Sequence, residues 1–287
     1  MYELELILFL FFGFVTFHFL YKWYRTLALA WPPERIKVTR RIFHCLPLAA
    51  LIMIIYTLKV LASFDVVGDI LYILFYIAFG FAWIYAGLFF VFSFFDISWR
   101  EDALHNHNPA AVAAIIGSFL GITCIYCGAN IGDGPGWWCV LLAGGLGMAS
   151  WFLLGVLANL MCGVPERITI DRDFGCGIRF GAYLLASGIL LGRASAGDWT
   201  SAAATIYEFK DGWPVLLLFL LLVLVDRIYS YRSVSQNSYI GGDGPNPCLP
   251  SVIWGIVFIA FAVIAVIMLP SLPQNPMYAG VSSLNLF

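Results

Sequence analysis

The stretch that decides the fold is Ile70–Phe95, ILYILFYIAFGFAWIYAGLFFVFSFF, a run without a single charged side chain. About 20 consecutive apolar residues are enough to cross the hydrocarbon core of a bilayer as a helix. Lipid offers no hydrogen-bond partner to the backbone, so a segment of this kind satisfies its amides internally. The stretch therefore predicts a transmembrane helix.

Similar uncharged runs follow one another along the whole chain. The other long ones are Leu6–Tyr21, Ile42–Leu58, Ala103–Gly132, Gly134–Pro165 and Gly244–Phe287. Two shorter ones, Phe180–Gly192 and Gly212–Val225, have flanking Arg, Trp or Tyr residues that extend their reach to the interface. Together they predict eight spans, at about 4–22, 42–63, 69–95, 109–129, 137–162, 177–195, 212–230 and 251–270.

The composition agrees with this fold class. Of 287 residues, 62% are hydrophobic and 11% charged, which leaves too little polar surface to enclose the apolar residues in water. We expect an all-α polytopic membrane protein in contact with membrane lipids. Glu3 and Glu5 precede the first run, where a cleavable signal peptide would carry basic residues. A net charge of −2 without a large basic cluster argues against a nucleic-acid partner.

Charge placement predicts the orientation. Loops that alternate between the two sides carry twelve Lys and Arg residues on one side and three on the other, the three being Lys59, Arg193 and Lys210. Because basic loops stay in the cytoplasm, both termini are expected on the non-cytoplasmic side.

The chain also contains weak internal repeats. Pro33–Val38 recurs as Pro165–Ile170, and Asn108-Pro109 recurs as Asn246-Pro247. These matches predict two four-helix halves, 1–131 and 132–270, followed by a non-cytoplasmic tail, 271–287. A finer alignment of 108–133 with 173–198 predicts a helix pair used four times with parallel topology.

One segment resembles a known family. His107-Asn108-Pro109-Ala110-Ala111-Val112-Ala113-Ala114, followed by Gly117, is similar to the motif of the YjfL-like bacterial inner-membrane proteins, and Asp173–Gly177 is a degenerate second copy. The sequence departs from the family pattern at Pro109 and at Asp173, where the family has Asn. The resemblance implies paired transmembrane helices and a location in the bacterial inner membrane, and it implies no activity.

Ionisable residues near the spans are the first candidates for function, because they are costly in lipid. Arg179 and Arg193 lie at opposite ends of the sixth span, where snorkelling of both side chains is the favoured interpretation and a wet cavity the alternative. Asp226 ends the seventh span beside Arg227, with an interfacial ion pair as an equal alternative to a functional role.

Three residues occupy equivalent helix starts according to the repeat: Asn108, Asp173 and Asn246. Helix capping is their expected role. Their shared depth also suggests the hypothesis that they line one polar site at a pore mouth. Glycine and alanine pairs four residues apart, such as Gly117 and Gly121, predict close packing among the fourth, fifth and sixth spans.

Cysteine and histidine give weak signals. Cys124 and Cys127 form a CxxC pair that Cys139 could approach, so a disulfide stays open, while His105 and His107 are interpreted as solvated loop residues with metal binding as a lesser alternative. We expect no metal, no cofactor and no enzymatic activity, since the common catalytic and nucleotide-binding signatures are absent.

Two functions from different classes follow from these observations. The first is a channel- or transporter-like protein with a polar path among the central helices. The second is a structural or docking subunit of a larger membrane complex, supported by an aromatic content of 17% and by the uncharged tail after residue 270. Assembly as a homo-oligomer or a hetero-complex is compatible with both.

Overall fold

The computed structural model describes residues 3–30, 37–236 and 248–277 and is an all-α bundle. Within these ranges eight helices are long and apolar enough to cross a membrane, which confirms the predicted fold class of a polytopic membrane protein. The long helices are α1 (Glu3–Leu29), α2 (Lys37–Val60), α4 (Ile70–Phe95), α5 (Pro109–Ala129), α6 (Trp137–Cys162), α8 (Phe174–Ala194), α10 (Pro214–Gln236) and α11 (Cys248–Met268).

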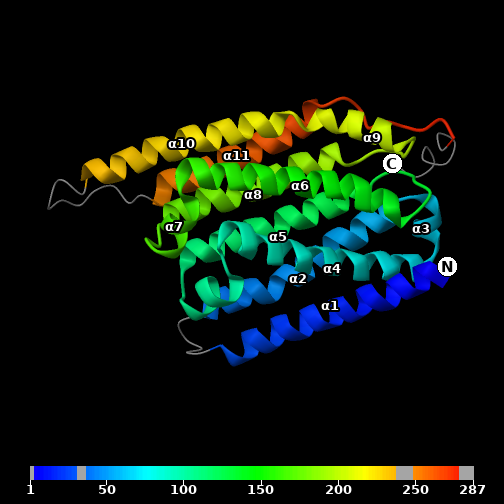
Figure 1. The fold of residues 1–287 in the computed structure, drawn as a ribbon, viewed down its shortest axis with the longest axis horizontal. Coiled ribbons are helices and arrows are strands. Elements are labelled where there is room, and N and C mark those ends of the chain that lie inside the picture. Colours follow the sequence, from blue (N-terminus) through cyan, green and yellow to red (C-terminus); the bar gives the residue numbers. More distant parts are fainter. Residues whose placement is uncertain (1–2, 31–36, 237–247, 278–287) are drawn as a thin grey trace.

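Short elements connect the long helices at the two ends of the bundle (Figure 1). One end, here called the α7 end, carries the π-helix η1 (Trp99–His105) and α7 (Val164–Thr169). The opposite end, the α9 end, carries α3 (Phe64–Gly68), α9 (Ala202–Glu208) and the 3-10 helix η2 (Phe209–Gly212). The first residues of α1 and the last of α11 both lie at the α9 end.

The predicted helix bounds are accurate where turns flank the apolar run. Where basic residues flank the run, the predicted helix is shorter than the observed one. Helices α5 and α6 begin and end at the predicted residues. In contrast, α1 continues to Leu29 and α2 already starts at Lys37, because Lys and Arg favour helices and reach water from within them.

The centre of the bundle is the contact between α5 and α8, which run parallel. A Cβ atom added to Gly117 would overlap the Gly181 backbone, and one added to Gly188 would overlap Gly121. Such contact is possible because the residue that faces the neighbouring backbone has no side chain, and close packing of this kind holds helices together in a membrane. The predicted close packing is therefore confirmed for the fourth and sixth spans, α5 and α8, whereas α11 packs on α8 more closely than the fifth span, α6, does.

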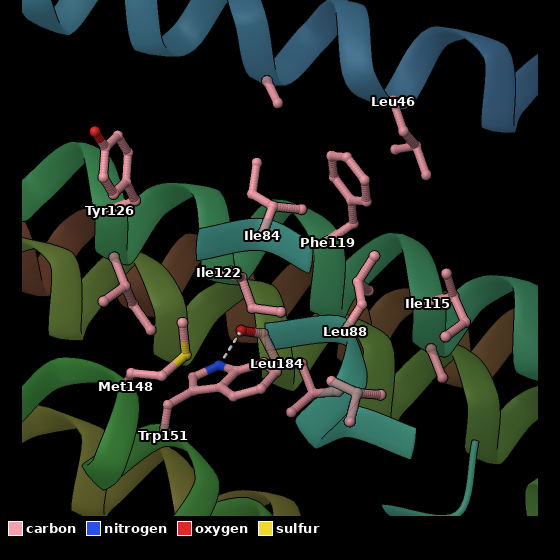
Figure 2. Close-up of a cluster of buried hydrophobic side chains, with 14 of the residues drawn as sticks. Leu46, Ile84, Leu88, Ile115, Phe119, Ile122, Tyr126, Met148, Trp151 and Leu184 are labelled. Atoms are coloured by element: carbon pink, nitrogen blue, oxygen red, sulfur yellow. Dashed lines mark hydrogen bonds between the residues drawn. The ribbon is translucent and has the colours of Figure 1, made fainter. Parts of the chain in front are cut away.

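Large side chains fill the space around this pair. Phe119 and Ile122 of α5 pack among Ile84 and Leu88 of α4 (Figure 2). From α6, the Trp151 indole donates to the Leu184 carbonyl at 2.9 Å, which satisfies a polar group that would otherwise be buried without a partner.

Loops at the α9 end are joined by hydrogen bonds to a carboxylate and to the segment that follows α11. Asp198 accepts from the Asp133 amide at 2.8 Å and from the Asn275 amide at 3.1 Å. The Asp198 amide in turn donates to the Pro273 carbonyl, and the Asn275 side chain donates to the Trp199 carbonyl. Part of the predicted tail thus lies on the chain's own loops.

Candidate functional site

Asn108 begins α5 and caps it. Its Oδ1 accepts from the amides of Ala110 and Ala111, which have no partner within the helix. Its Nδ2 donates to the Ile168 carbonyl of α7 at 2.6 Å, so the buried amide also joins two elements. The capping prediction is confirmed for Asn108.

Asp173 caps α8 in the same way, with Oδ1 accepting from the Cys176 amide at 2.9 Å. Its Oδ2 is paired with Arg167 at 2.8 Å. No hydrogen bond joins Asp173 to Asn108 among the described residues, and Asn246 lies outside them. The hypothesis that the three line one polar site stays a prediction.

The turns before α5 and α8 have matching backbones. His107 and Arg172 adopt left-handed φ angles of 52° and 53°. The amide that follows each donates back to a carbonyl six residues earlier, from Asn108 to Asp102 and from Asp173 to Arg167. The two turns lie 65 residues apart in the sequence. The hydrogen-bonded residues Asp133 and Asp198 are separated by the same 65 residues.

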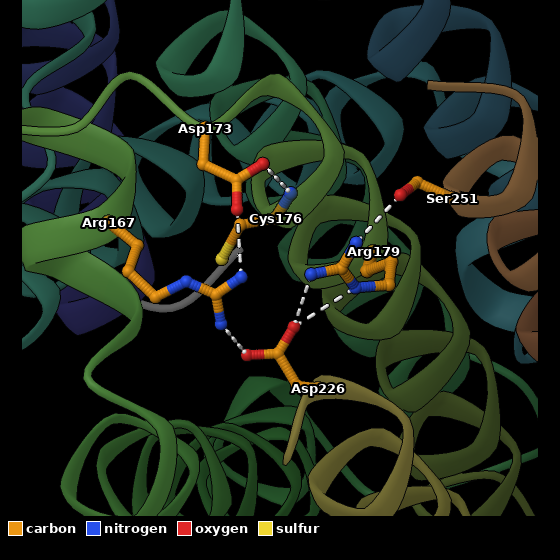
Figure 3. A network of polar contacts seen from close by, with 6 residues as sticks. All are labelled: Arg167, Asp173, Cys176, Arg179, Asp226 and Ser251. Carbon is orange, nitrogen blue, oxygen red and sulfur yellow. Dashed lines mark hydrogen bonds and ion pairs between the residues drawn. The ribbon is translucent and has the colours of Figure 1, made fainter. Parts of the chain in front are cut away.

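The most concentrated charge in the described bundle surrounds Asp226 of α10 (Figure 3). Its Oδ1 accepts from Nε and Nη2 of Arg179 on α8, at 3.0 and 2.6 Å. Both side chains are almost completely buried, with 2% of Arg179 and 1% of Asp226 exposed. In this interior of low dielectric constant, each charge is compensated by the other. Removing one partner would leave the other charge buried and unpaired, which is strongly destabilising.

Further contacts complete this cluster. Asp226 Oδ2 accepts from Arg167 Nη1, and Arg179 Nη1 donates to Ser251 of α11 at 2.6 Å. The Arg179 guanidinium also lies over the Tyr229 ring, 4.6 Å from its centroid. The cluster of Arg167, Asp173, Arg179, Asp226 and Ser251, here called the charge cluster, therefore joins α7, α8, α10 and α11.

Two expectations are corrected by this geometry. Arg179 does not snorkel, because a carboxylate on the next helix compensates its charge inside the bundle. Asp226 pairs with Arg179 and Arg167 in place of the neighbouring Arg227, which is exposed. Sequence spacing misses both pairs, since Arg179 and Asp226 are 47 residues apart.

Hydrogen bonds also affect the titration of Asp173, outside the spans. Burial alone would raise the pKa of this carboxyl group. The hydrogen bond from the Cys176 amide and the pairing with Arg167 outweigh burial, so the pKa is lowered from its ordinary value.

Arg193 lies at the opposite end of α8. Its Nη2 donates to the Pro270 carbonyl, just after α11. Near this end the loops enclose a small pocket of about 60 Å³. Its polar lining includes Asn130, Asp133, Ser195, Asp198, Thr205 and Glu208.

Between the charge cluster and this pocket, α8 carries a line of buried polar side chains. Arg179, Tyr183 and Ser187 follow one another at intervals of four residues, which places them along one side of the helix. Ser195 continues the polar series in the pocket wall. The Tyr183 hydroxyl has no hydrogen-bond partner among the described residues although the side chain is 1% exposed. The i, i+4 spacing was visible in the sequence, but burial of that side was not.

Cysteine and histidine form no metal site in the described part of the chain. No group of three or more His, Cys, Asp or Glu there could hold a metal ion. Cys124, Cys127 and Cys139 are free thiols. His105 pairs with Glu101 at 3.0 Å on the exposed side of η1, whereas the His107 Nδ1 atom is buried.

Comparison with protein-family models, with curated proteins and with solved structures finds no match to this chain. The resemblance to the YjfL-like family therefore stays a prediction.

Proposed function

We propose that the chain is a transporter-like membrane protein whose polar path follows α8 from the pocket at the α9 end to the charge cluster at the α7 end. The observation that carries this proposal is the unpartnered Tyr183 hydroxyl, buried on the same side of α8 as Arg179 and Ser187. Buried polar groups are nearly always hydrogen-bonded, and a water or a polar solute would supply the missing partner.

The glycine contact restricts where this path can run. Gly117, Gly121 and Gly128 place the α5 backbone against α8, which leaves no room for a solute between these two helices. The path proposed here lies on the side of α8 that carries Tyr183. Opening toward the α7 end would require the Arg179–Asp226 pair to separate, so this pair acts as the inner gate.

The matching turns before α5 and α8 support an origin of the two helices by duplication. A pseudo-twofold axis between parallel α5 and α8 would run along the membrane normal, as for repeats with an even number of spans.

The orientation in the membrane is proposed from the basic loop residues that the sequence analysis counted. With Arg167 and Arg172 at the α7 end, that end faces the cytoplasm of an inner membrane, and the start of α1 and the end of α11 face the other side.

Cysteine accessibility tests the path. In a chain whose seven cysteines are replaced, Tyr183→Cys and Ser187→Cys are expected to react with a small water-soluble thiosulfonate reagent in sealed vesicles. Leu184→Cys is the matched control, because this residue is equally buried and its backbone lies against Gly121 of α5. Equal protection at all three positions would contradict the path.

The docking-subunit alternative loses one of its supports. Pro273 and Asn275 of the tail bond to the chain's own loop at Asp198, so this part of the tail is not free to cover a partner. Native mass spectrometry after mild solubilisation separates the two functions: a stable hetero-complex would favour the subunit.

A further inference from the structure

Basic residues gather where α1 ends and α2 begins, at the α7 end of the bundle (Figure 1). The two helices are in contact here. Trp23 Nε1 donates to the Phe43 carbonyl at 3.0 Å, and the Tyr24 ring stacks on the His44 ring with centroids 5.5 Å apart. The Lys and Arg residues within two turns of these contacts, here called the basic surface, are Lys22, Arg25, Lys37, Arg40 and Arg41.

No carboxylate compensates the basic surface. Within the residues that the structure describes, none of its side chains is ion-paired. Helix α2 contains no acidic residue, and the acidic residues of α1, Glu3 and Glu5, lie at its other end. Residues 31–36, outside the described ranges, add one acidic and one basic residue to the sequence. On η1, which packs on α2, Glu101 already pairs with residues of its own helix. The positive charges of the basic surface therefore lack an internal partner.

The donors of the basic surface are mostly unused as well. Arg40 Nη2 donates to the Ala28 carbonyl at 3.1 Å. Arg25 and Arg41 are exposed, and neither donates a hydrogen bond to another described residue. In the charge cluster, by contrast, Arg167 and Arg179 are both paired with carboxylates. Free guanidinium groups bind phosphate oxygens through two parallel hydrogen bonds, so the surface is suited to a phosphate group.

Exposed apolar side chains continue from the basic surface into the membrane. Phe17 lies eight residues before Arg25 on the same side of α1, about 12 Å along the helix axis. On α2, Leu48 and Ile52 follow Arg41 at intervals of seven and eleven residues, which again keeps them on one side. All three apolar side chains are exposed. Cations at the end of each helix and apolar groups further in match the two parts of a phospholipid.

We propose that the basic surface binds the phosphate headgroup of an anionic phospholipid from the surrounding bilayer, with an acyl chain lying on Phe17, Leu48 and Ile52. Charge complementarity carries the proposal, because clusters of Lys and Arg beside a membrane-spanning helix attract anionic headgroups. The α7 end is also the one proposed to face the cytoplasm, where the leaflet carries anionic lipid. Binding of this lipid does not depend on the proposed transport.

Lipid retention tests the proposal. The full chain is extracted from vesicles of equal parts phosphatidylglycerol and phosphatidylcholine with identical acyl chains, and native mass spectrometry counts the lipids that stay bound. We expect the wild type to retain phosphatidylglycerol at least tenfold over phosphatidylcholine, and the double variant Arg25→Gln with Arg41→Gln to fall to about threefold or less. Arg172→Gln with Arg227→Gln is the matched control. It removes two exposed cations at the same end of the bundle and should keep the wild-type preference.

Photolabelling of the wild-type chain locates the lipid without any variant. A phosphatidylglycerol with a diazirine near the head of one acyl chain should label peptides from the end of α1 and the start of α2. Inorganic phosphate in excess, at constant ionic strength, should not displace it, since the free anion has no acyl chain. Labelling spread evenly over the bundle, displacement by inorganic phosphate, or the same lipid preference in both double variants would each overturn the proposal.

Discussion

At the scale of single residues, Asp226 is the acceptor that the buried Arg179 and the half-buried Arg167 share. Replacing Asp226 by Asn keeps the shape but leaves Arg179 without a compensating charge, while Arg167 keeps its pair with Asp173. We expect a loss of about 3–5 kcal/mol in the free energy of unfolding, the cost of breaking a buried ion pair on one side. Reversible unfolding in bicelles measures it. Arg227→Gln, one residue on and exposed, should change stability by less than about 0.5 kcal/mol.

A double variant separates charge from packing at the same place. Arg179→Met with Asp226→Leu removes both charges and keeps most of the volume, so much of the stability lost in Asp226→Asn should return. If instead the double variant is less stable than Asp226→Asn, the ion pair itself adds to the free energy of unfolding, beyond each charge compensating the other.

Asp173 makes stability dependent on pH in a defined direction. Because its pKa is lower in the folded chain than in the unfolded chain, its contribution is complete above the unfolded pKa of about 4 and is lost as the pH falls through the folded pKa. Unfolding free energies measured between about pH 6 and pH 3 should decline less steeply for Asp173→Asn than for the wild type. Parallel declines would show that Asp173 does not contribute.

At the scale of helices, the contact of α5 with α8 predicts which glycines are essential. Gly117→Ala would drive a Cβ atom into the Gly181 backbone, which cannot rotate away as a side chain could. Separation of the two helices would cost about 3 kcal/mol or more by loss of packing. Gly145→Ala is the control, because nothing lies within 4 Å of a Cβ atom there, and it should be neutral or slightly stabilising. Thermal unfolding in detergent compares the two.

The same helices show which features of the structure can be predicted from the sequence. Uncharged length was enough to place α5 and α6, because lipid imposes helical structure on any such segment. Small residues four apart predicted close packing. The partner of Arg179 could not be predicted, since only the folded bundle brings α10 beside α8. Burial of the Tyr183 side of α8 likewise depends on tertiary contacts.

At the scale of the whole molecule, Asp198 connects the loops at the α9 end to the segment after α11. Asp198→Ala removes the acceptor of two amides, those of Asp133 and Asn275. We expect hydrogen exchange at these amides to accelerate at least tenfold, while exchange within α5 stays unchanged. Thr200→Ala, exposed and two residues on, is the control. Faster exchange throughout the bundle would mean that the loops stabilise the helices as well.

The separation of the charge cluster along the chain has a consequence for biogenesis. A ribosome delivers Arg179 to the membrane 47 residues before Asp226. Until α10 has been synthesised, α8, the least apolar of the eight spans, must enter the bilayer with an uncompensated guanidinium. Insertion of α8 is therefore the step at which the nascent chain depends most on the translocon and on its already inserted neighbour α5.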